Sequence, residues 1–337
     1  MGHLPTFDGR GQIAAEMARQ HADALASYHA NAARAAEIAQ SIRRTGRLIL
    51  LGMGGSHWLN RTMLPLYRNL GIDVSAEVLS EALITPLPPQ PRTVILTSQS
   101  GGSGEIAHYL SRPSPGEERF GATLNAGSTL GLGVPCLLGL GGPEKAFAAT
   151  RSLLICQALH GAVLNALGHD TSAALSVLAD PPQVGIGAAL HHLAPARSLV
   201  LTGRASLQGV AENGALCLME LSRLPAFAFE GGQLRHGPME MISPDMGAIV
   251  LRPAGAGSAL SARLATDLAA ICPTVVFDLS GEDPAPGALT VALPALSGLE
   301  AAHAALPALQ LLLVDIAATR VNNLGQPVRS SKVTTTL

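Results

Sequence analysis

The sequence contains few charged residues and no concentrated charge of either sign. Aspartate, glutamate, lysine and arginine make up 14% of its 337 residues, and the formal net charge is −2. Proteins that bind nucleic acid or acidic membranes carry basic patches, so the sequence indicates neither partner. Low charge also leaves less of the surface strongly hydrated, and we expect much of it to be covered by another subunit of a homo-oligomer.

Cysteine is scarce too, and the signs of secretion are missing. The four cysteines, Cys136, Cys156, Cys217 and Cys272, are far apart and lie in apolar runs, which favours reduced core residues over disulfides. Residues 1–5 contain no basic region followed by a hydrophobic segment, and no apolar stretch reaches about 18 residues without interruption. We therefore expect a cytoplasmic protein without a membrane span.

The histidines form no metal-binding pattern. His191 and His192 are adjacent, so in a helix their side chains would point about 100° apart and could not bind one ion. No metal site is predicted. The further histidines interpreted as ordinary polar positions are His21, His29, His160 and His169.

Apolar residues are plentiful, at 47% of the chain, and they are arranged as strands alternating with helices. This alternation predicts an α/β fold with a mostly parallel, doubly wound sheet covered by helices on both faces. The predicted strands are Leu48–Leu51, Val74–Val78, Thr93–Thr97 and Val134–Leu140, and the predicted helices cover 12–45 and His57–Leu70.

The strand-and-turn pattern then repeats about 150 residues later. Residues Leu199–Ser206 resemble the earlier strand with its glycine turn, and Ala248–Leu251 corresponds to the strand at Thr93–Thr97. Two tandem domains are therefore expected, divided by a helical stretch at 146–178 and a linker at Asp180–Pro182. The predicted organisation is a helical segment at 1–46, domains at 47–180 and 181–323, and a tail at 324–337.

A hydroxyl-rich glycine loop follows the predicted strand at Thr93–Thr97. Residues 97–105 read Thr-Ser-Gln-Ser-Gly-Gly-Ser-Gly-Glu, where a buried strand ends and a helix begins. Backbone N–H groups at a helix start carry partial positive charge, glycines allow close approach, and serine hydroxyls add donors. The loop lacks the Gly-Lys-Ser/Thr ending of a nucleotide P-loop, which favours a sugar phosphate as the ligand. Only the first half carries this loop.

A second glycine turn, Gly52–Ser56, lies on the same predicted edge, because doubly wound sheets bind ligands beyond the carboxyl ends of their strands. Gly54, Gly55 and Ser56 are therefore candidate ligand contacts. The alternative is that this turn is purely structural, since glycine turns after strands are common in such folds.

Three side chains are candidates for chemistry. Glu220 follows an apolar helical run and can be desolvated enough to act as a base, although helical periodicity alone does not place it inside or outside the core. His236 lies between glycines and a proline, in a segment suited to presenting one imidazole; the alternative is a histidine that caps a short helix starting at Pro238. Lys332 lies in a polar tail, to which residue patterns alone assign no role.

The chain resembles the double sugar-isomerase-domain (SIS) family, which includes the isomerase half of glucosamine-6-phosphate synthase and stand-alone glucosamine-6-phosphate deaminases. The resemblance covers nearly the whole chain. It rests on Gly52–Ser56, Ser98–Gly101, Gly142–Thr150, Glu212–Glu220, Gly232–Pro238 and Gln326–Thr334.

The resemblance implies a role for each matching residue. Glu220 would shuttle a proton between C1 and C2, and His236, supplied across a homodimer interface, would open the sugar ring. Lys332 would lie near the substrate, so the tail would fold into the site, and neither a metal nor an organic cofactor would be required. The implied phosphate-binding residues are Ser56, Ser98, Gln99, Ser100 and Ser103.

Departures from the synthase pattern favour the deaminase branch. The chain opens on its N-terminal helical segment, so we expect no glutaminase activity. Cys217 replaces a lysine three residues before the base, and Gly102-Ser103 replaces Glu-Thr in the loop. The expected function is an aminosugar-phosphate isomerase/deaminase that converts glucosamine 6-phosphate, or a close relative, to fructose 6-phosphate and ammonia. A fructosamine-6-phosphate deglycase and a non-catalytic sugar-phosphate sensor are the alternatives.

Overall fold

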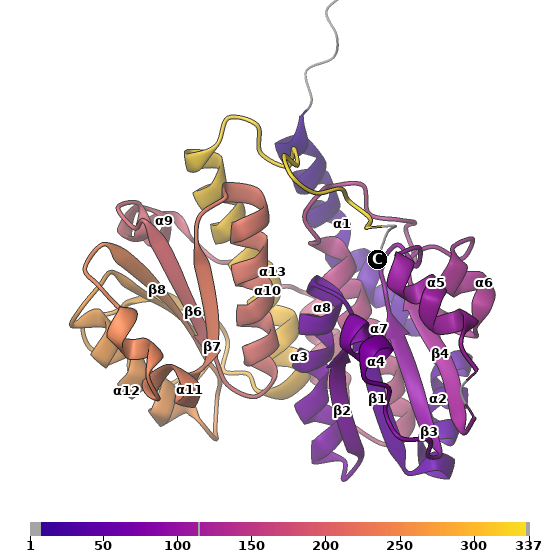
Figure 1. The fold of residues 1–337 in the computed structure, drawn as a ribbon. Coiled ribbons are helices and arrows are strands. Elements are labelled where there is room, and N and C mark those ends of the chain that lie inside the picture. The colour runs from indigo at the N-terminus through magenta and orange to yellow at the C-terminus, as the bar shows by residue number, and fades with distance from the viewer. Residues whose placement is uncertain (1–7, 114, 335–337) are drawn as a thin grey trace, which may run out of the picture.

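The structure is a computed structural model that describes residues 8–113 and 115–334. Residues 1–7, on which the prediction of no secretion signal rests, lie outside the described residues, as do the last three residues of the predicted tail. Figure 1 shows two α/β halves, the first in purple and magenta and the second in salmon and orange.

The N-terminal segment forms two helices, α1 (Gly9–Ala30) and α2 (Ala32–Thr45), where the sequence predicts one. The break falls at Asn31, whose amide nitrogen donates to the carbonyls of Ser27 and Leu138 and whose Oδ1 accepts from the Leu138 backbone N–H. Asparagine side chains compete with helical backbone bonds in this way. Asn31 thereby ties the helix junction to the edge of the first sheet.

The first half contains a parallel sheet in the order β2-β1-β3-β4-β5, which confirms the predicted α/β class. Its strands are β1 (Arg47–Gly52), β2 (Asp73–Val78), β3 (Arg92–Thr97), β4 (Glu117–Thr123) and β5 (Cys136–Leu138). Its helices are α3 (Gly55–Asn69), α4 (Leu79–Ile84), α5 (Gly104–Ser111) and α6 (Thr129–Gly133). β4 has no counterpart among the predicted strands, and β5 is shorter than the predicted Val134–Leu140.

The second half repeats this topology. Its sheet has the order β10-β9-β8-β6-β7, which read backwards matches the first sheet strand for strand. Its strands are β6 (Ser198–Gly203), β7 (Ala226–Glu230), β8 (Met246–Arg252), β9 (Thr274–Asp278) and β10 (Leu289–Ala292). Its helices are α10 (Ser206–Ser222), α11 (Gly231–Arg235), α12 (Ser258–Ala269) and α13 (Gly298–Arg320), with a 3₁₀ turn at Pro238–Met241. The predicted tandem repeat is therefore confirmed.

Helices α7 (Arg151–Leu167), α8 (Ser172–Ala179) and α9 (Gly187–Leu193) connect the halves. The predicted helical stretch at 146–178 is thus two helices, and the first begins only at Arg151 because residues 143–150 are irregular. The α7 residues from Arg151 to Leu164 are all buried, so this helix forms part of the core rather than a surface divider.

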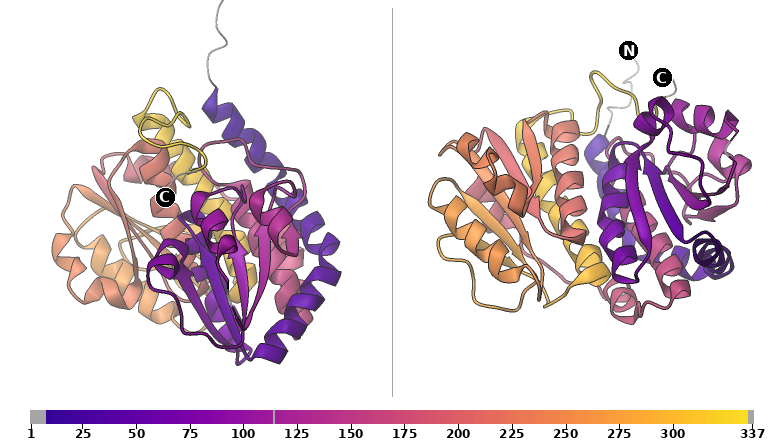
Figure 2. Two further views of the ribbon diagram at one scale, coloured as in Figure 1. Left: turned by 45° about the vertical axis from the view of Figure 1, so that its right-hand side comes forward. Right: turned by 60° about the horizontal axis from the view of Figure 1, so that its bottom comes forward.

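The two halves meet where α3 packs on α10, as the two views of Figure 2 also show. Gly209 of α10 lies against the α3 backbone: a Cβ at this position would be 2.4 Å from the Thr62 nitrogen and 2.4 Å from the Trp58 oxygen. An ion pair between Arg61 and Glu212, 2.9 Å long, crosses the same contact. The two helices run in opposite directions across this contact, because Gly209 lies against Thr62 whereas Leu216, further along α10, lies nearest to Gly54 at the start of α3. The end of α10 that carries Glu220 therefore lies beside the carboxyl edge of the first sheet.

Among the described residues, α13 alone is long and apolar enough to cross a membrane. However, 83% of its apolar window is buried inside the protein, as in the core helix of a globular fold. It packs on α10, α7 and α8.

Candidate functional site

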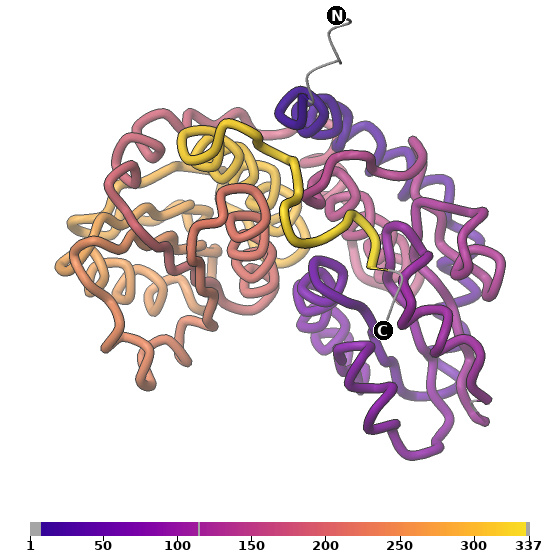
Figure 3. The backbone as a smooth tube through the Cα atoms, turned by 45° about the horizontal axis from the view of Figure 1, so that its top comes forward, coloured from indigo at the N-terminus to yellow at the C-terminus, as the bar shows by residue number. Residues whose placement is uncertain are grey.

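A cavity of about 360 Å³ lies beyond the carboxyl ends of the first sheet. Its walls come from the turn after β1, the loop after β3, residues 147–156, the α10 helix and the tail at 330–334. Figure 3 shows the tail, in yellow, running from the second half across to the first. The cavity is therefore shared by both halves and closed on one side by the tail.

The loop after β3 keeps a tight conformation that depends on Gly101. Its φ is +63°, and a Cβ there would lie 2.1 Å from the Ser128 hydroxyl oxygen, so no larger residue fits. Ser98 Oγ accepts from the Gly101 N–H at 3.1 Å and Ser100 Oγ accepts from the Gly102 N–H at 3.4 Å. Because these oxygens act as acceptors within the loop, their protons remain available to donate to an anion.

The helix that follows the loop strengthens this anion site. Ser103 is the N-cap of α5 and accepts from the Ile106 N–H, and Ser103 itself lines the cavity. Ser98, Gln99 and Ser100 line it as well. All four loop residues implied by the family resemblance therefore face one space at a helix start.

The turn after β1 forms the neighbouring wall. Gly54 has φ +50° and ψ −127°, a conformation that favours glycine, and it brings the chain directly into the start of α3. Gly54, Gly55 and Ser56 all line the cavity. The turn therefore borders the cavity, and a contact between it and a ligand stays a prediction.

Glu220 lies half-buried near the end of α10 and lines the same cavity. Burial raises the pKa of its carboxyl to about 7, while the nearby Lys332 ammonium lowers it and the Glu144 carboxylate raises it further. A carboxyl group with such a pKa can both accept and return a proton near neutral pH. The ambiguity left by helical periodicity is thus resolved toward the cavity.

Lys332 also lies in the cavity wall, brought there by the tail. Its Nζ donates to the Phe147 carbonyl at 3.2 Å and lies 3.7 Å from Glu144 Oε2. The tail is held further by the Thr334 carbonyl, which accepts from the Gly104 N–H at 3.1 Å. The tail therefore lies against the first turn of α5, beside the serine loop.

His236 is the one predicted chemical residue that lies away from the cavity lining described here. It is exposed in the second half, at the end of α11. The alternative that it caps the turn started by Pro238 is wrong, because Gly237, with φ +119°, occupies that cap position. A role for His236 across a subunit interface stays a prediction.

Several cavity features were not anticipated from the sequence. Glu144 was quoted only as part of a matching segment, yet its buried carboxylate lies beside Lys332. Ser152 and Phe147 line the wall next to it. Cys217, predicted as a reduced core residue, lines the cavity too, and burial raises the pKa of its thiol to about 12, which keeps it protonated.

Among the residues that the structure describes, there is no cluster of three or more histidine, cysteine, aspartate or glutamate side chains arranged for a metal ion. The polar side chains that line the cavity carry hydroxyls, the two amides of Gln99 and Asn213, carboxylates and one ammonium. Such groups suit an anionic polyhydroxylated ligand.

Comparison with known proteins places this geometry in context. Residues 192–284 match the family model described as SIS domain. A glutamine–fructose-6-phosphate aminotransferase of Rhizobium meliloti is 28% identical over 230 residues, covering 62% of this chain and 36% of that protein. The corresponding protein of Caulobacter vibrioides is 26% identical over 288 residues, covering 78% of this chain and 48% of its own. The chain thus spans between a third and a half of the length of these relatives.

Three solved structures share the whole fold. Tagatose-6-phosphate ketose/aldose isomerase from Escherichia coli has a TM-score of 0.80 at 19% identity, covering 98% of this chain and 100% of its own. The C-terminal domain of glucosamine-fructose-6-phosphate aminotransferase from Francisella tularensis has a TM-score of 0.79 at 17% identity, covering 97% of this chain and 100% of its own. Glucosamine-6-phosphate deaminase from Thermotoga maritima has a TM-score of 0.70 at 17% identity, covering 92% of this chain and 100% of its own. At these identities the likeness shows two tandem domains of this architecture, and nothing finer.

Proposed function

We propose that the chain belongs to the SIS-domain phosphosugar isomerases, whose fold it shares, and that it is an aminosugar-phosphate isomerase/deaminase. Its substrate would be glucosamine 6-phosphate or a close relative, and its products fructose 6-phosphate and ammonia. The observation that carries the proposal is the single cavity in which a serine loop suited to phosphate faces a carboxyl group with a pKa of about 7.

Anchoring of the phosphate is the first step. The hydroxyls of Ser98, Ser100 and Ser103 would donate to the phosphate oxygens at the start of α5. Each hydrogen bond to a charged oxygen contributes about 1.5–3 kcal/mol, so several of them fix one end of the sugar. The carbon chain then extends toward α10.

Proton transfer is the second step, after the ring has opened. The Glu220 carboxylate removes the proton from C2 of the open-chain aldehyde and returns it to C1. The amine nitrogen loses a proton and the aldehyde oxygen gains one, so the product has an imine at C2 and a hydroxyl at C1. Water adds to the imine carbon, the C–N bond breaks, and ammonia leaves with fructose 6-phosphate as the other product. In this proposal, His236 of a second subunit moves a proton from the C1 hydroxyl to the ring oxygen to open the ring.

The charge of the cavity favours a substrate that carries an amine. Glu220 and Glu105 line it, Glu144 lies behind its wall, and Lys332 is the one lysine or arginine among its lining residues. Cys217 adds no charge, because a thiol can only become an anion and burial keeps this one protonated. Carboxylates in excess attract an ammonium group at C2 more strongly than a neutral hydroxyl.

The direct test is incubation of the purified protein with glucosamine 6-phosphate, with ammonia and fructose 6-phosphate both measured. We expect equal amounts of the two products, at least about 10²-fold faster than with Glu220→Gln. Glu37→Gln, in an exposed ion pair on α2, is the matched control and should keep full activity. Turnover at the Glu220→Gln rate would refute the proposal.

A substrate panel separates the alternatives. Galactosamine 6-phosphate tests the C4 configuration, N-acetylglucosamine 6-phosphate tests the need for a free amine, and a fructosamine 6-phosphate adduct tests deglycase activity. Turnover of the adduct alone would make the protein a deglycase. Saturable binding of every sugar phosphate without any product would make it a sensor.

The interface role of His236 has its own test. His236→Ala and Glu220→Gln should each be inactive as homodimers. If the histidine serves the partner's cavity, unfolding and refolding the two variants together gives mixed dimers with one complete site and about a quarter of the wild-type activity. No recovery in a confirmed mixed dimer would place the histidine outside the reaction.

A further inference from the structure

Glu144 is a carboxylate with no exposed side-chain surface, in the irregular segment before α7. Its Oε1 accepts from the Thr150 backbone N–H at 2.9 Å and from the Thr150 hydroxyl at 3.0 Å, and its Oε2 accepts from the Ser152 hydroxyl at 2.5 Å. A buried carboxylate is costly unless it is hydrogen-bonded and paired with a positive charge. The hydrogen bonds to Glu144 come from residues close to it in sequence, whereas the positive charge comes from a distant part of the chain.

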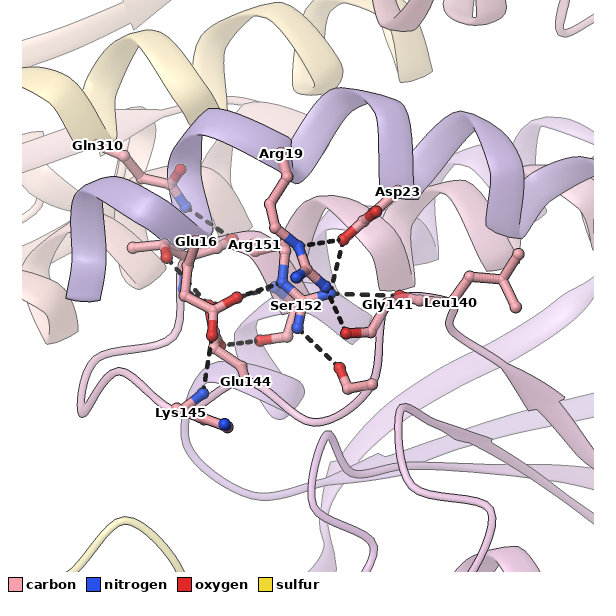
Figure 4. A network of polar contacts seen from close by, with 12 residues as sticks. Glu16, Arg19, Asp23, Leu140, Gly141, Glu144, Lys145, Arg151, Ser152 and Gln310 are labelled. Carbon is pink, nitrogen blue, oxygen red and sulfur yellow. Dashed lines mark hydrogen bonds and ion pairs between the residues drawn. The ribbon is translucent and has the colours of Figure 1, made fainter. Parts of the chain in front are cut away.

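The segment that carries Glu144 is fixed to α1 and α7, as Figure 4 shows. The fully buried Arg151 donates to the Glu16 carboxylate of α1 and, through Nη2, to the Gly142 carbonyl at 2.7 Å. Glu16 also accepts from the Lys145 backbone N–H at 2.9 Å. The Glu144 carboxylate is therefore presented from a rigid support rather than from a free loop.

The positive charge that faces it is the Lys332 ammonium, 3.7 Å from Oε2. This lysine lies on a tail of irregular structure that follows α13, and its side chain remains 26% exposed. The tail also makes backbone or surface hydrogen bonds, between Gly104 and Thr334 and from Arg223 to Asn323 and to the Gln326 carbonyl. Lys332 thus makes the one ion pair between the tail and the cavity wall in the described part of the chain.

We propose that Glu144 is a positioning residue that anchors Lys332 and thereby holds the tail closed across the cavity. Glu144 lies behind the wall and touches no substrate; it acts through the lysine. The consequence for catalysis rests on the proposed function, whereas the anchoring of the tail does not. With the anchor in place, Lys332 stays beside Glu220 and its ammonium faces the reacting end of the sugar.

Limited trypsin digestion tests the anchor without any substrate. Trypsin can cleave the tail after Arg329 and after Lys332, and mass spectrometry separates the loss of residues 330–337 from the loss of residues 333–337. Cleavage after Arg329 is the readout, because Glu144→Gln and Lys332→Met both keep that site. We expect Glu144→Gln to be cleaved there at least about 10-fold faster than the wild type, because the tail opens more often. The control Glu37→Gln should be cleaved at the wild-type rate.

Lys332→Met provides the second variant, in case Glu144→Gln disturbs the wall. It removes the same ion pair from the tail side, and it should speed cleavage after Arg329 to a similar extent. The double variant should be cleaved no faster than either single variant, because both changes break one interaction. Unchanged cleavage in both single variants, or additive effects in the double variant, would overturn the proposal.

Activity gives an independent readout. In Glu144→Gln, we expect kcat for glucosamine 6-phosphate to fall about 10-fold to 100-fold while KM changes little, because the phosphate loop is untouched. If the wild type has no deaminase activity, the proposed function fails but the digestion result still decides the anchor. A Glu144→Gln enzyme with wild-type kcat and faster digestion would remove the catalytic consequence and keep the anchor.

Discussion

The two halves of the protein have the same strand order but differ at the edge where a ligand would bind. Gly54 after β1 and Ala205 after β6 adopt nearly the same backbone conformation, with φ near 50° and ψ of −127°. In the first half, the residue before this turn position is Met53 and the adjoining space is a cavity. In the second half, the residue before it is Arg204.

Arg204 fills the corresponding region of the second half. Its side chain lies within 3.3 Å of the points where a Cβ on Gly231 or Gly257 would stand, and it pairs with Glu230 at 2.6 Å. At the end of the next strand, Arg252 is buried and pairs with Asp278 at 3.0 Å. Where the first half has hydroxyls and an open space, the second half has ion pairs that satisfy one another.

This difference means that two halves of the same fold contribute different groups to one cavity. In the proposed reaction, the serine loop of the first half would bind the phosphate. The second half, whose own edge is occupied, contributes Glu220 from α10 to the same cavity. Ligand binding by one half and chemistry by the other requires that the halves be held in fixed relation.

The largest loss of stability and activity is expected from a substitution that separates α3 from α10. Gly209→Ala places a methyl group 2.3–2.4 Å from atoms of Thr62 and Trp58, which α3 can avoid only by moving away from α10. We expect a loss of about 3 kcal/mol in the free energy of unfolding and loss of most activity, measured by denaturant unfolding and product assay. Gly187→Ala, where the added Cβ meets nothing within 4 Å, is the matched control.

Gly101→Ala should abolish the anion site of the first half without separating the halves. The added methyl clashes with Ser128, and the φ of +63° disfavours alanine. We expect KM for the sugar phosphate to rise about 10²-fold, as several loop hydrogen bonds are lost. The counterpart is Gly255→Ala in the loop after β8, with φ +75° and open space around its Cβ, which should cost about 1 kcal/mol of stability and leave KM unchanged.

The pH dependence of kcat/KM tests whether Glu220, from the second half, is the base. Burial raises the pKa of Glu220 to about 7, so kcat/KM should rise with pH through about 7 as the base ionises. Removing the ammonium in Lys332→Met should raise that pKa and move the profile to higher pH. A flat profile between pH 5 and 9 would contradict a base at Glu220.

The same raised pKa fixes the sign of a stability effect. The folded protein holds the Glu220 proton more tightly than the unfolded chain does, so this group stabilises the fold at low pH and the benefit is lost as pH rises through about 7. Glu220→Gln should therefore be more stable than the wild type above pH 7, by about 1–3 kcal/mol. The gain should disappear at pH 4.

The smallest effects are expected from exchanging the turn residues. Ala205→Gly should stabilise the protein by about 1 kcal/mol, because the residue leaves a strained conformation. Gly54→Ala should cost about 1–3 kcal/mol from backbone strain alone, since its Cβ would meet nothing closer than Leu216 at 3.9 Å. Equal and negligible changes in both variants would mean that the turn carries no strain.

The fold could be predicted where strands were apolar and bounded by glycine. β1, β2 and β3 fell close to their predicted ranges. β1 and β3 are buried almost throughout, whereas Val74 is the one buried residue of β2. β4 was missed because it begins with the charged residues Glu117, Glu118 and Arg119. Glu117 pairs with Arg92 of β3 and Glu118 with Arg44 of α2, and these partners meet them only in the folded chain. The helix break at Asn31 likewise depends on a contact with Leu138.

The site residues also include some that the sequence could predict and some that it could not. The serine loop was predictable, since its chemistry lies in consecutive residues between a strand and a helix. Lys332 had no role in the residue pattern, because a polar tail shows no sign of the surface on which it folds. Glu144 was missed for a similar reason: Thr150 and Ser152 are near it in sequence, but Lys332 is 188 positions away and meets it only in the folded chain.

The contact between α3 and α10 also bears on which length of sugar the cavity would accept. In the proposed reaction one half would hold the phosphate and the other would move the proton, so the distance between the two sites would be set by Gly209 and the backbone it touches. A five-carbon or seven-carbon sugar phosphate held at the same loop would then present the wrong carbon to the base. Selectivity for six carbons would follow from the spacing of two helices rather than from any side chain that contacts the sugar.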